Sequence, residues 1–361
     1  MKVLEVRNLR VRFDTERGPV QAVDEFSLDL AQGETVALVG ESGSGKSVAS
    51  LALLGLVPDP PGVIETGEVL LGGENLLAAS PERLRRVRGR EIAMVFQDPR
   101  SALHPLLPLG LQLSEVLEVH EGLSRREARV RAAQALGEVG LSDPEARLDS
   151  YPHELSGGMR QRAMIAMALI CKPKVLIADE PTTALDATVQ VQILDLLRTL
   201  QRQYGTAILL VSHDLGVVAR IADRVQVMYA GRVVEVALAE ELFDRPLHPY
   251  TRGLLASVPR LQGPASRRLE SIGGAPPDPL NPSPGCAFAP RCGFVQDACR
   301  KQRPPLSGVP RAVSDVLLVG GRRSACFERE RLDLAMPGPA ADRSAAGPGM
   351  EEARDSGRSR P

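Results

Sequence analysis

The sequence has little of what nucleic-acid-binding, membrane-spanning and disulfide-rich proteins need. It has no tryptophan, 3% aromatic residues and five cysteines among 361 residues. The net charge is −1, so no overall positive field points to nucleic acid. Its long apolar runs, such as AMIAMALIC at 163–171, reach nine residues, whereas a membrane-spanning helix needs about 20. We therefore expect neither a nucleic-acid partner nor a membrane span.

The N-terminus also lacks the pattern of a secretion signal. Residues 1–13, MKVLEVRNLRVRF, alternate charged and apolar side chains and contain no continuous apolar core. We expect a cytosolic protein that reaches a membrane only through partners, where disulfides are disfavoured. Lysine is scarce as well, with five among the 44 basic residues. A lysine retained in so arginine-rich a chain is a candidate for a specific role.

Short β-rich runs that alternate with helical patterns indicate an α/β fold. The sequence predicts buried strands at TVALVG, IAMVFQ, VLIAD and AILLVS, which are residues 35–40, 92–97, 175–179 and 207–212. Strand–helix–strand alternation favours a largely parallel sheet that is covered on both faces. Residues 225–236 read as a hairpin that turns at Ala230–Gly231.

Between about 98 and 165 the strand signal disappears, which predicts a helical insertion. Ser124 and Glu127 form a capping-box pattern for a helix that runs to about Val139. Residues 241–361 hold 17 of the 29 prolines, so the second part of the chain is organised differently. The predicted segments are a first core part (1–97), the helical insertion (98–165), a second core part (166–240), a C-terminal domain (241–333) and a disordered tail (334–361).

GESGSGKS matches the phosphate-binding pattern G-x-x-x-x-G-K-[ST] in full, between a predicted strand and a predicted helix. Its glycines let backbone N–H groups turn inward and cradle phosphate oxygens at a helix N-terminus. Lys46 is expected on the β- and γ-phosphates and Ser47 on Mg²⁺. The nucleotide-binding candidates here are Gly40, Glu41, Ser42, Gly43, Ser44, Gly45, Lys46 and Ser47.

KVLIADEP at 174–181 supplies an acidic pair at the end of a buried strand. We expect this strand beside the strand of the phosphate-binding loop. Asp179 would then help to hold Mg²⁺, and Glu180 would polarise the water that attacks the γ-phosphate. A phosphate loop with these acids fits many kinases, GTPases and ATPases.

LSGGMRQR at 155–162 narrows the class, because Ser156 and two glycines open a second helix N-terminus suited to an anion. Here the chain resembles the ATP-binding cassette family, whose signature LSGG closes over ATP bound by another subunit. A P-loop kinase would leave this motif unexplained. The resemblance implies a P-loop NTPase (RecA-like) core with a mainly parallel sheet, an N-terminal antiparallel β part, a helical subdomain and a small Cys-rich C-terminal domain.

The remaining family elements appear in order along the chain, and the resemblance gives each a role. Gln97 would reach Mg²⁺ and the attacking water, and His213 would hydrogen-bond the γ-phosphate. Phe13 matches the position that stacks on adenine, although a core role for it stays open. The resemblance adds Ser156, Gly157, Gly158 and Asp186 (of Ala184–Asp186) to the ATP-binding candidates.

Residues 1–333 look like the ATPase subunits of oligopeptide/dipeptide importers, most clearly in RPLHPYTRGLLASVPR at 245–260. The resemblance implies a second ATPase subunit, two membrane permeases and an extracytoplasmic peptide-binding protein, at the cytoplasmic face of the plasma membrane. The segment after Gln97, through Asp98 and Pro99, would dock on the permeases. Uptake of nickel or another small solute stays an alternative, and a soluble ATPase of DNA repair or translation is a weaker one.

Four of the five cysteines cluster near the C-terminus, at Cys286, Cys292, Cys299 and Cys326. A Pro-rich segment with little apolar periodicity needs a cross-link, and four thiolates can supply one by holding metal. The spacing fits paired zinc ligands poorly, while ligand chemistry alone allows Zn²⁺ or a [4Fe–4S] cluster. The family resemblance favours the [4Fe–4S] cluster.

Overall fold

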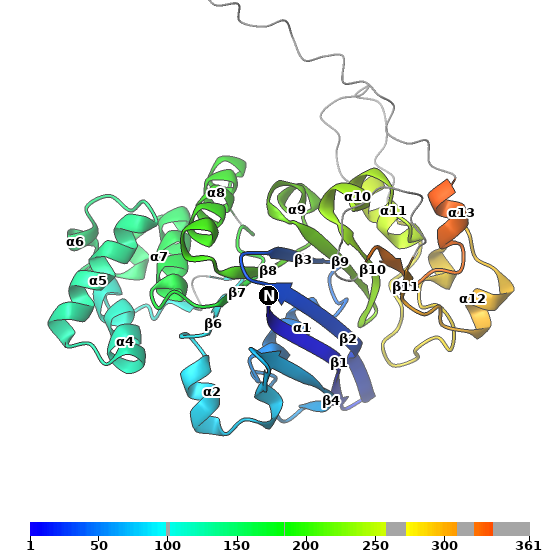
Figure 1. The fold of residues 1–361 in the computed structure, drawn as a ribbon, viewed down its shortest axis with the longest axis horizontal. Coiled ribbons are helices and arrows are strands. Elements are labelled where there is room, and N and C mark those ends of the chain that lie inside the picture. The colour runs from blue at the N-terminus through cyan, green and yellow to red at the C-terminus, as the bar shows by residue number, and fades with distance from the viewer. Residues whose placement is uncertain (99–101, 184, 258–271, 309–320, 335–361) are drawn as a thin grey trace, which may run out of the picture.

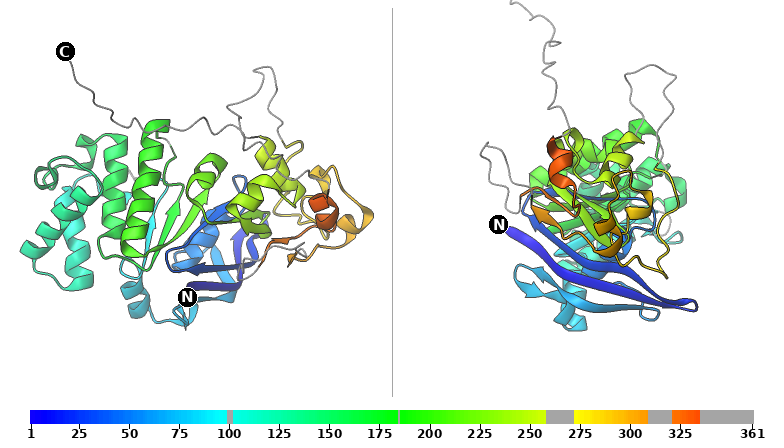
Figure 2. Two further views of the ribbon diagram at one scale, coloured as in Figure 1. Left: turned by 45° about the horizontal axis from the view of Figure 1, so that its top comes forward. Right: turned by 90° about the vertical axis from the view of Figure 1, so that its right-hand side faces the viewer.

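The computed structural model describes residues 1–98, 102–183, 185–257, 272–308 and 321–334. Its N-terminal part is an antiparallel sheet in the order β2-β1-β4-β5 (Figure 1). The strands are β1 (Lys2–Thr15), β2 (Gly18–Ala31), β4 (Gly62–Leu71) and β5 (Glu74–Asn75). Figure 2 shows the long strands β1 and β2 running along one side of the molecule.

A second sheet has eight strands within the described residues, in the order β6-β7-β8-β3-β9-β10-β12-β11. Strands β6, β7, β8, β3 and β9 run parallel to one another, and the remaining pairs are antiparallel. The bounds are β3 (Thr35–Val39), β6 (Ile92–Val95), β7 (Val175–Asp179), β8 (Ala207–Ser212), β9 (Arg224–Tyr229), β10 (Arg232–Leu238), β11 (Ser307–Gly308) and β12 (Arg323–Ser324). The four predicted strands and the predicted hairpin are confirmed.

One expectation about strand order is wrong. Strand β7, which carries Asp179, does not lie beside β3, because β8 lies between them. A run of apolar residues reveals that a strand is buried, but neighbours in a parallel sheet are set by how the crossover helices pack. The acidic pair therefore reaches the phosphate-binding loop across one intervening strand.

Alternating residues of β3 enter two different hydrophobic cores, one on each face of the main sheet. Ala37 and Val39 belong to the core with the helical insertion, whereas Val36 and Leu38 belong to the core with the N-terminal sheet. The strand side chains alternate between faces, so a continuous apolar run is what a sheet covered on both sides requires. The antiparallel sheet and α1 (Lys46–Leu53) close the second core.

The elements between β6 and β7 in the described part of the chain are all helices, and they form a separate group at the left of Figure 1. They are α4 (Leu109–Glu121), α5 (Arg125–Glu138), α6 (Pro144–Arg147), a 3₁₀ turn (Pro152–Glu154) and α7 (Gly157–Leu169). The predicted capping box at Ser124 and Glu127 is present. Two further helices, α8 (Ala187–Tyr204) and α9 (Leu215–Ile221), contribute to the hydrophobic core that the main sheet shares with the helical insertion.

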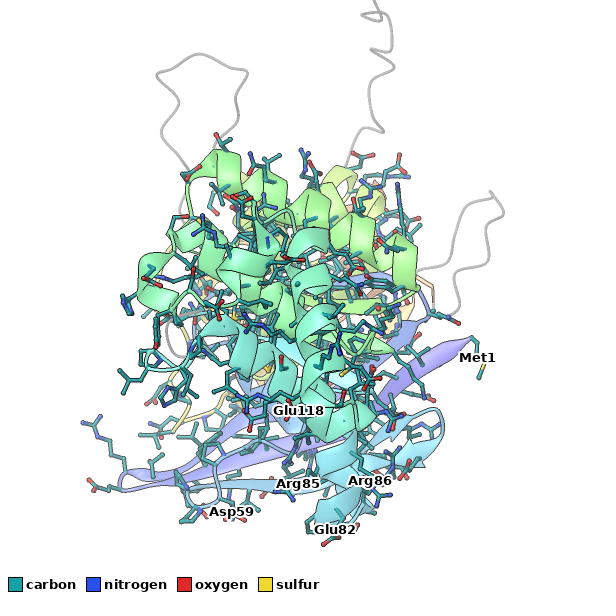
Figure 3. The ribbon with its side chains drawn as sticks, turned by 90° about the vertical axis from the view of Figure 1, so that its left-hand side faces the viewer. Met1, Asp59, Glu82, Arg85, Arg86 and Glu118 are labelled. Carbon is teal, nitrogen blue, oxygen red and sulfur yellow. The ribbon has the colours of Figure 1, made fainter. Side chains whose placement is uncertain are left out.

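Helix α2 (Pro81–Val87) follows a 3₁₀ turn (Leu76–Ala78) and lies at the edge of the molecule. Figure 3 shows Glu82, Arg85 and Arg86 of this helix pointing outward. Its hydroxyl cap, Ser80 Oγ, accepts a hydrogen bond from the Arg83 N–H at 3.3 Å. The helix thus turns a charged face to solvent and buries Val87.

The C-terminal segment extends the main sheet, which the sequence did not reveal. Strand β12 pairs with β10 through Glu235 and Ser324, and β11 follows beyond it. The helices are α10 (Ala239–Asp244), α11 (Pro249–Ala256), a 3₁₀ turn (Ala289–Arg291), α12 (Asp297–Lys301) and α13 (Arg329–Leu334). The tail predicted from 334 lies outside the described residues from 335 onward.

Candidate functional site

The phosphate-binding loop connects β3 to α1, as the motif predicts. Gly40, Gly43 and Gly45 have φ angles of 156°, 79° and 102°, a region that glycine enters without steric cost. A Cβ atom on Gly40 would lie 2.2 Å from the carbonyl oxygen of Met228. The glycines therefore serve the tight path of the loop, and the loop places α1 with its N-terminus at the phosphate site.

Lys46 folds back over this loop. Its ammonium donates hydrogen bonds to the carbonyl oxygens of Gly40 (2.8 Å) and Glu41 (2.9 Å) and contacts Ser44 Oγ at 3.3 Å. Burial lowers the pKa of Lys46, and the negative charges of Glu180, Asp179 and Glu41 oppose that shift. The loop and the acidic pair thus share one electrostatic environment.

Ser47 and Asp179 meet at the predicted magnesium position. Ser47 Oγ donates to Asp179 Oδ1 at 3.4 Å, although 132 positions separate the two residues. Burial raises the pKa of Asp179, while the Ser47 hydrogen bond and the charge of Lys46 act in the opposite direction. A hydroxyl beside a buried carboxylate is an oxygen donor set of the kind that Mg²⁺ prefers. The two side chains fit a magnesium ion that also binds substrate phosphates.

Glu180 is the centre of a second constellation, built from the ends of three adjacent strands. Gln97 Nε2 donates to its carboxylate at 2.8 Å, and His213 Nδ1 lies 2.9 Å from it. Burial raises the pKa of Glu180, but hydrogen bonds from His213 and Thr183 outweigh it, so the pKa lies below its ordinary value. The carboxylate is therefore ionised at neutral pH, as a general base requires.

Thr183 belongs to this constellation, and the sequence interpretation missed it. Its hydroxyl donates to Glu180 Oε2 at 2.9 Å. Glu180 has a φ of 47°, an uncommon conformation for a residue with a side chain. That turn lets Thr183, three positions later, bend back onto the carboxylate. The signal in the sequence was a hydroxyl three residues after the acid, within the run Thr182–Thr183.

The signature helix begins as predicted, but at a distance from the phosphate loop. Ser156 is the N-cap of α7, and its Oγ accepts a hydrogen bond from the Met159 N–H at 3.3 Å. A Cβ atom on Gly158 would lie 2.9 Å from a methyl carbon of Val189, so α7 packs closely on α8 there. Figure 1 shows α7 and α1 in different parts of the molecule. The N-terminus of α7 is therefore not gathered with the other site residues.

Two further candidates have structural contacts of their own. Asp186 is the N-cap of α8, where its Oδ1 accepts a hydrogen bond from the Val189 N–H at 2.9 Å. Phe13, on β1, is half-buried and packs against the core beneath the main sheet. Roles of these residues in nucleotide binding stay predictions. Ala184 and Pro99, which the sequence interpretation also named, lie outside the described residues.

The four C-terminal cysteines line one small apolar cavity, which we call the cysteine cavity. Its wall consists of Cys286, Cys292, Cys299 and Cys326 together with His248 and apolar side chains, among them Phe288, Phe294 and Phe327. All five thiols of the chain are free, and Cys171 is not part of this wall. Burial raises the pKa of Cys326 to about 12 and also raises the pKa of Cys286 and of Cys292.

The four thiols line one cavity, but this alone does not make the cavity a metal site. No group of three or more His, Cys, Asp or Glu side chains in the described part of the chain is placed so that it could hold a metal ion. Raised thiol pKa values also oppose the thiolate form that metals bind.

No helix in the described ranges has the length and apolar character to cross a bilayer.

The chain matches two known protein families. Residues 23–183 match the family described as "ABC transporter", and residues 234–299 match "Oligopeptide/dipeptide transporter, C-terminal region". The first match contains the phosphate-binding loop, the signature and the Asp179–Glu180 pair. The second begins in β10 and ends at Cys299, so it includes most of the cysteine cavity.

Relatives resemble the chain over most of its length. It is 50% identical to the oligopeptide transport ATP-binding protein OppD of Bacillus subtilis over 305 residues, which is 84% of this chain and 85% of OppD. It is also 50% identical to a putative peptide import ATP-binding protein of Brucella abortus over 327 residues, covering 91% of this chain and 95% of that protein.

Solved structures agree with the fold. The dimeric structure of MJ0796, a bacterial ABC transporter cassette, has a TM-score of 0.59 and 28% identity, over 65% of this chain and 98% of that one. The CbiO1 structure from Clostridium perfringens gives a TM-score of 0.58 and 29% identity, over 67% of this chain and 90% of that one. Sequence likeness across nearly the whole chain and structural likeness across the ATPase core lead to one conclusion: the chain belongs to the ABC transporter family.

Proposed function

We propose that this chain is the ATP-hydrolysing subunit of an ABC importer for di- and oligopeptides. The observation that carries the proposal is the carboxylate of Glu180, held by Gln97, Thr183 and His213 at the ends of adjacent strands. The C-terminal match to oligopeptide/dipeptide transporters and the names of the relatives support peptide as the cargo.

Each residue of the site has a defined task in this proposal. Backbone N–H groups of the phosphate loop bind the β- and γ-phosphates, and the Lys46 ammonium turns from the loop carbonyls to the phosphates. Ser47, Asp179 and Gln97 would hold Mg²⁺, which when bound would neutralise charge on the transferred phosphoryl group. Glu180 accepts a proton from the attacking water, and His213 orients that carboxylate or the γ-phosphate.

The separation of Ser156 from the phosphate loop supports a site shared between two subunits. Ser156, Gly157 and Gly158 would close over ATP that is bound by the partner, and Asp186 would lie at the same boundary. Phe13 would stack on the adenine. We infer a second ATPase subunit, two permeases and an extracytoplasmic peptide-binding protein as partners, with this chain at the cytoplasmic face of the membrane.

The domain limits from the sequence remain part of the proposal. The ATPase core would comprise 1–97 and 166–240, the helical subdomain 98–165 and the C-terminal domain 241–333. The stretch between β6 and β7 contains helices and no strand among its described residues, which supports a helical subdomain there, although α7 continues past 165 to Leu169.

A transport experiment tests the function. The chain, its neighbouring permeases and the binding protein would be reconstituted in vesicles, and ATP-dependent uptake of a radiolabelled tripeptide would be measured. The matched control is the same complex with Glu180→Gln, which keeps the shape of the side chain but cannot accept a proton. We expect peptide uptake by the complex that contains the wild-type chain and none by the complex that contains the Glu180→Gln variant. Uptake of Ni²⁺ in place of the peptide would refute peptide as cargo but retain the ATPase.

We infer further that the cysteine cavity holds a [4Fe–4S] cluster. The convergence of four thiols in one apolar wall supports this, while loading must draw the thiols closer and deprotonate them. Protein purified without oxygen should be brown and contain about four irons per chain. Cys299→Ser should lose the iron and Cys171→Ser should keep it. Colourless protein that contains zinc would show that the cavity holds zinc and not a cluster. Protein without any metal would refute the metal site.

A further inference from the structure

Glu41 is an acidic residue inside a loop that binds anionic phosphates, and each of its polar groups has a partner. Its backbone N–H donates to the hydroxyl of Tyr250 at 2.7 Å. Its carbonyl oxygen accepts a hydrogen bond from Lys46 at 2.9 Å. Its carboxylate accepts two hydrogen bonds from Arg291, at 2.7 and 3.0 Å. The carbonyl oxygen also accepts from the Ser44 N–H at 3.2 Å, so two of the four partners, Tyr250 and Arg291, come from the C-terminal segment.

Arg291 is held in place independently of Glu41. Its side chain is 4% exposed, and its other N–H groups donate to the carbonyl oxygens of Gly273 (2.9 Å) and Ile272 (3.3 Å). The guanidinium lies 5.9 Å from the ring centre of Phe288 and 6.0 Å from that of Tyr229. A planar guanidinium held on several sides presents a fixed fork, and the carboxylate of Glu41 fits that fork in a bidentate pair.

The pair joins parts of the chain that are 250 positions apart. Arg291 ends the 3₁₀ turn that directly precedes Cys292, whereas Glu41 follows β3 in the ATPase core. In Figure 1 the C-terminal segment with α12 lies at the end of the main sheet next to β10, and Figure 2 shows the same arrangement. The contact therefore connects the wall of the cysteine cavity to the phosphate loop.

An unpaired carboxylate at position 41 would disturb ATP binding in two ways. It would repel the phosphates directly, because like charges in a partly buried site interact strongly. It would also compete with them for Lys46, since the negative charge of Glu41 already reaches that ammonium and opposes the lowering of its pKa by burial. Arg291 weakens both effects by partly neutralising the carboxylate and holding it toward the C-terminal segment.

We propose that Arg291 is a positioning residue of the ATP site, which holds the carboxylate of Glu41 and so leaves Lys46 free for the phosphates. The C-terminal segment then contributes directly to ATP affinity, in addition to any role in assembly. This inference rests on ATP binding at the phosphate loop, as in the proposed function, and is independent of the cargo.

The test is the affinity of the full-length chain for a fluorescent ATP analogue, measured with Mg²⁺. Arg291→Gln keeps a polar side chain with an N–H donor group, but it is shorter, has fewer donors and carries no charge, and it should weaken binding about tenfold. Arg291→Lys keeps the charge but not the bidentate fork, so it should weaken binding less than Arg291→Gln does. In the double variant Glu41→Gln/Arg291→Gln no carboxylate is left unpaired, so the affinity should be higher than in Arg291→Gln alone.

Recovery in the double variant is the readout that a purely structural role would not produce. Arg300→Gln, an exposed arginine on α12, is the matched control and should bind like the wild type. Wild-type affinity in Arg291→Gln would overturn the inference. So would a loss in Arg291→Gln that the double variant does not restore, or an equal loss in Arg291→Lys. Wild-type protein that binds no ATP would instead overturn the proposed function, and this inference with it.

Discussion

A mildly acidic solution should loosen the C-terminal segment through one buried imidazole, His248. This side chain is 2% exposed, and its Nδ1 accepts a hydrogen bond from the Tyr250 N–H at 3.1 Å as the N-cap of α11. An imidazolium has no free lone pair and cannot accept that bond. Burial accordingly lowers the pKa of His248 from 6.5 to about 4, against a weaker opposing hydrogen bond to the Ala325 backbone.

The shift converts into a stability difference by proton linkage. A histidine whose pKa is lowered in the folded state contributes stability above its unfolded pKa, and loses it as the pH falls from about 6.5 toward 4. With these two pKa values, the contribution of His248 to the free energy of unfolding falls by about 2 kcal/mol between about pH 7.5 and pH 5. The nearby carboxylate of Glu235, whose pKa burial raises, changes stability with pH in the opposite direction.

The measurement therefore compares how much stability two proteins, the wild type and a His248 variant, each lose over the same change in pH. His248→Asn retains a side-chain acceptor at the N-cap but does not titrate, and Glu235 is present in both proteins. Urea unfolding followed by circular dichroism at about pH 7.5 and pH 5 gives the loss of stability for each. The wild type should lose about 2 kcal/mol more than the variant. Equal losses would refute the argument that the folded state holds His248 neutral.

Four substitutions test the ATPase site itself. Glu180→Gln should lower kcat about 10²- to 10⁴-fold in a phosphate-release assay with little change in ATP affinity, and a wild-type rate would exclude Glu180 as the base. Ser156→Ala removes the N-cap of α7 and should lower the free energy of unfolding by about 1 kcal/mol. It should reduce ATPase activity of the assembled dimer but not nucleotide affinity of the isolated chain; equal loss of both would contradict a shared site. Gly40→Ala should lower the free energy of unfolding by about 2 kcal/mol or more, because its Cβ would lie 2.2 Å from a carbonyl oxygen. Gly43→Ala, with open space around its Cβ, should cost about 1 kcal/mol, and equal melting temperatures of the two variants would contradict the packing argument.

Local features of the site could be predicted because each lies within a few residues of its own cause. The glycines of the phosphate loop, the carboxylate that follows β7 and the N-cap Ser156 all depend on neighbours in the chain. The family resemblance added Gln97 and His213, and the structure brings both to Glu180. Thr183 was missed because its role depends on an uncommon backbone turn at Glu180, which residue types alone do not reveal.

By itself, the amino-acid sequence determined four buried strands of the main sheet, the β9–β10 hairpin, the loop that receives phosphate and the acid that can serve as a base. The tertiary structure decided which distant parts meet: β8 lies between β3 and β7, four cysteines line one cavity, and Arg291 reaches Glu41. The physical reason is the range of the interactions. Local hydrogen bonds and the spacing of apolar residues depend on neighbours a few positions away in the chain. A contact between positions 41 and 291 forms only when both sheets and the C-terminal segment have packed together.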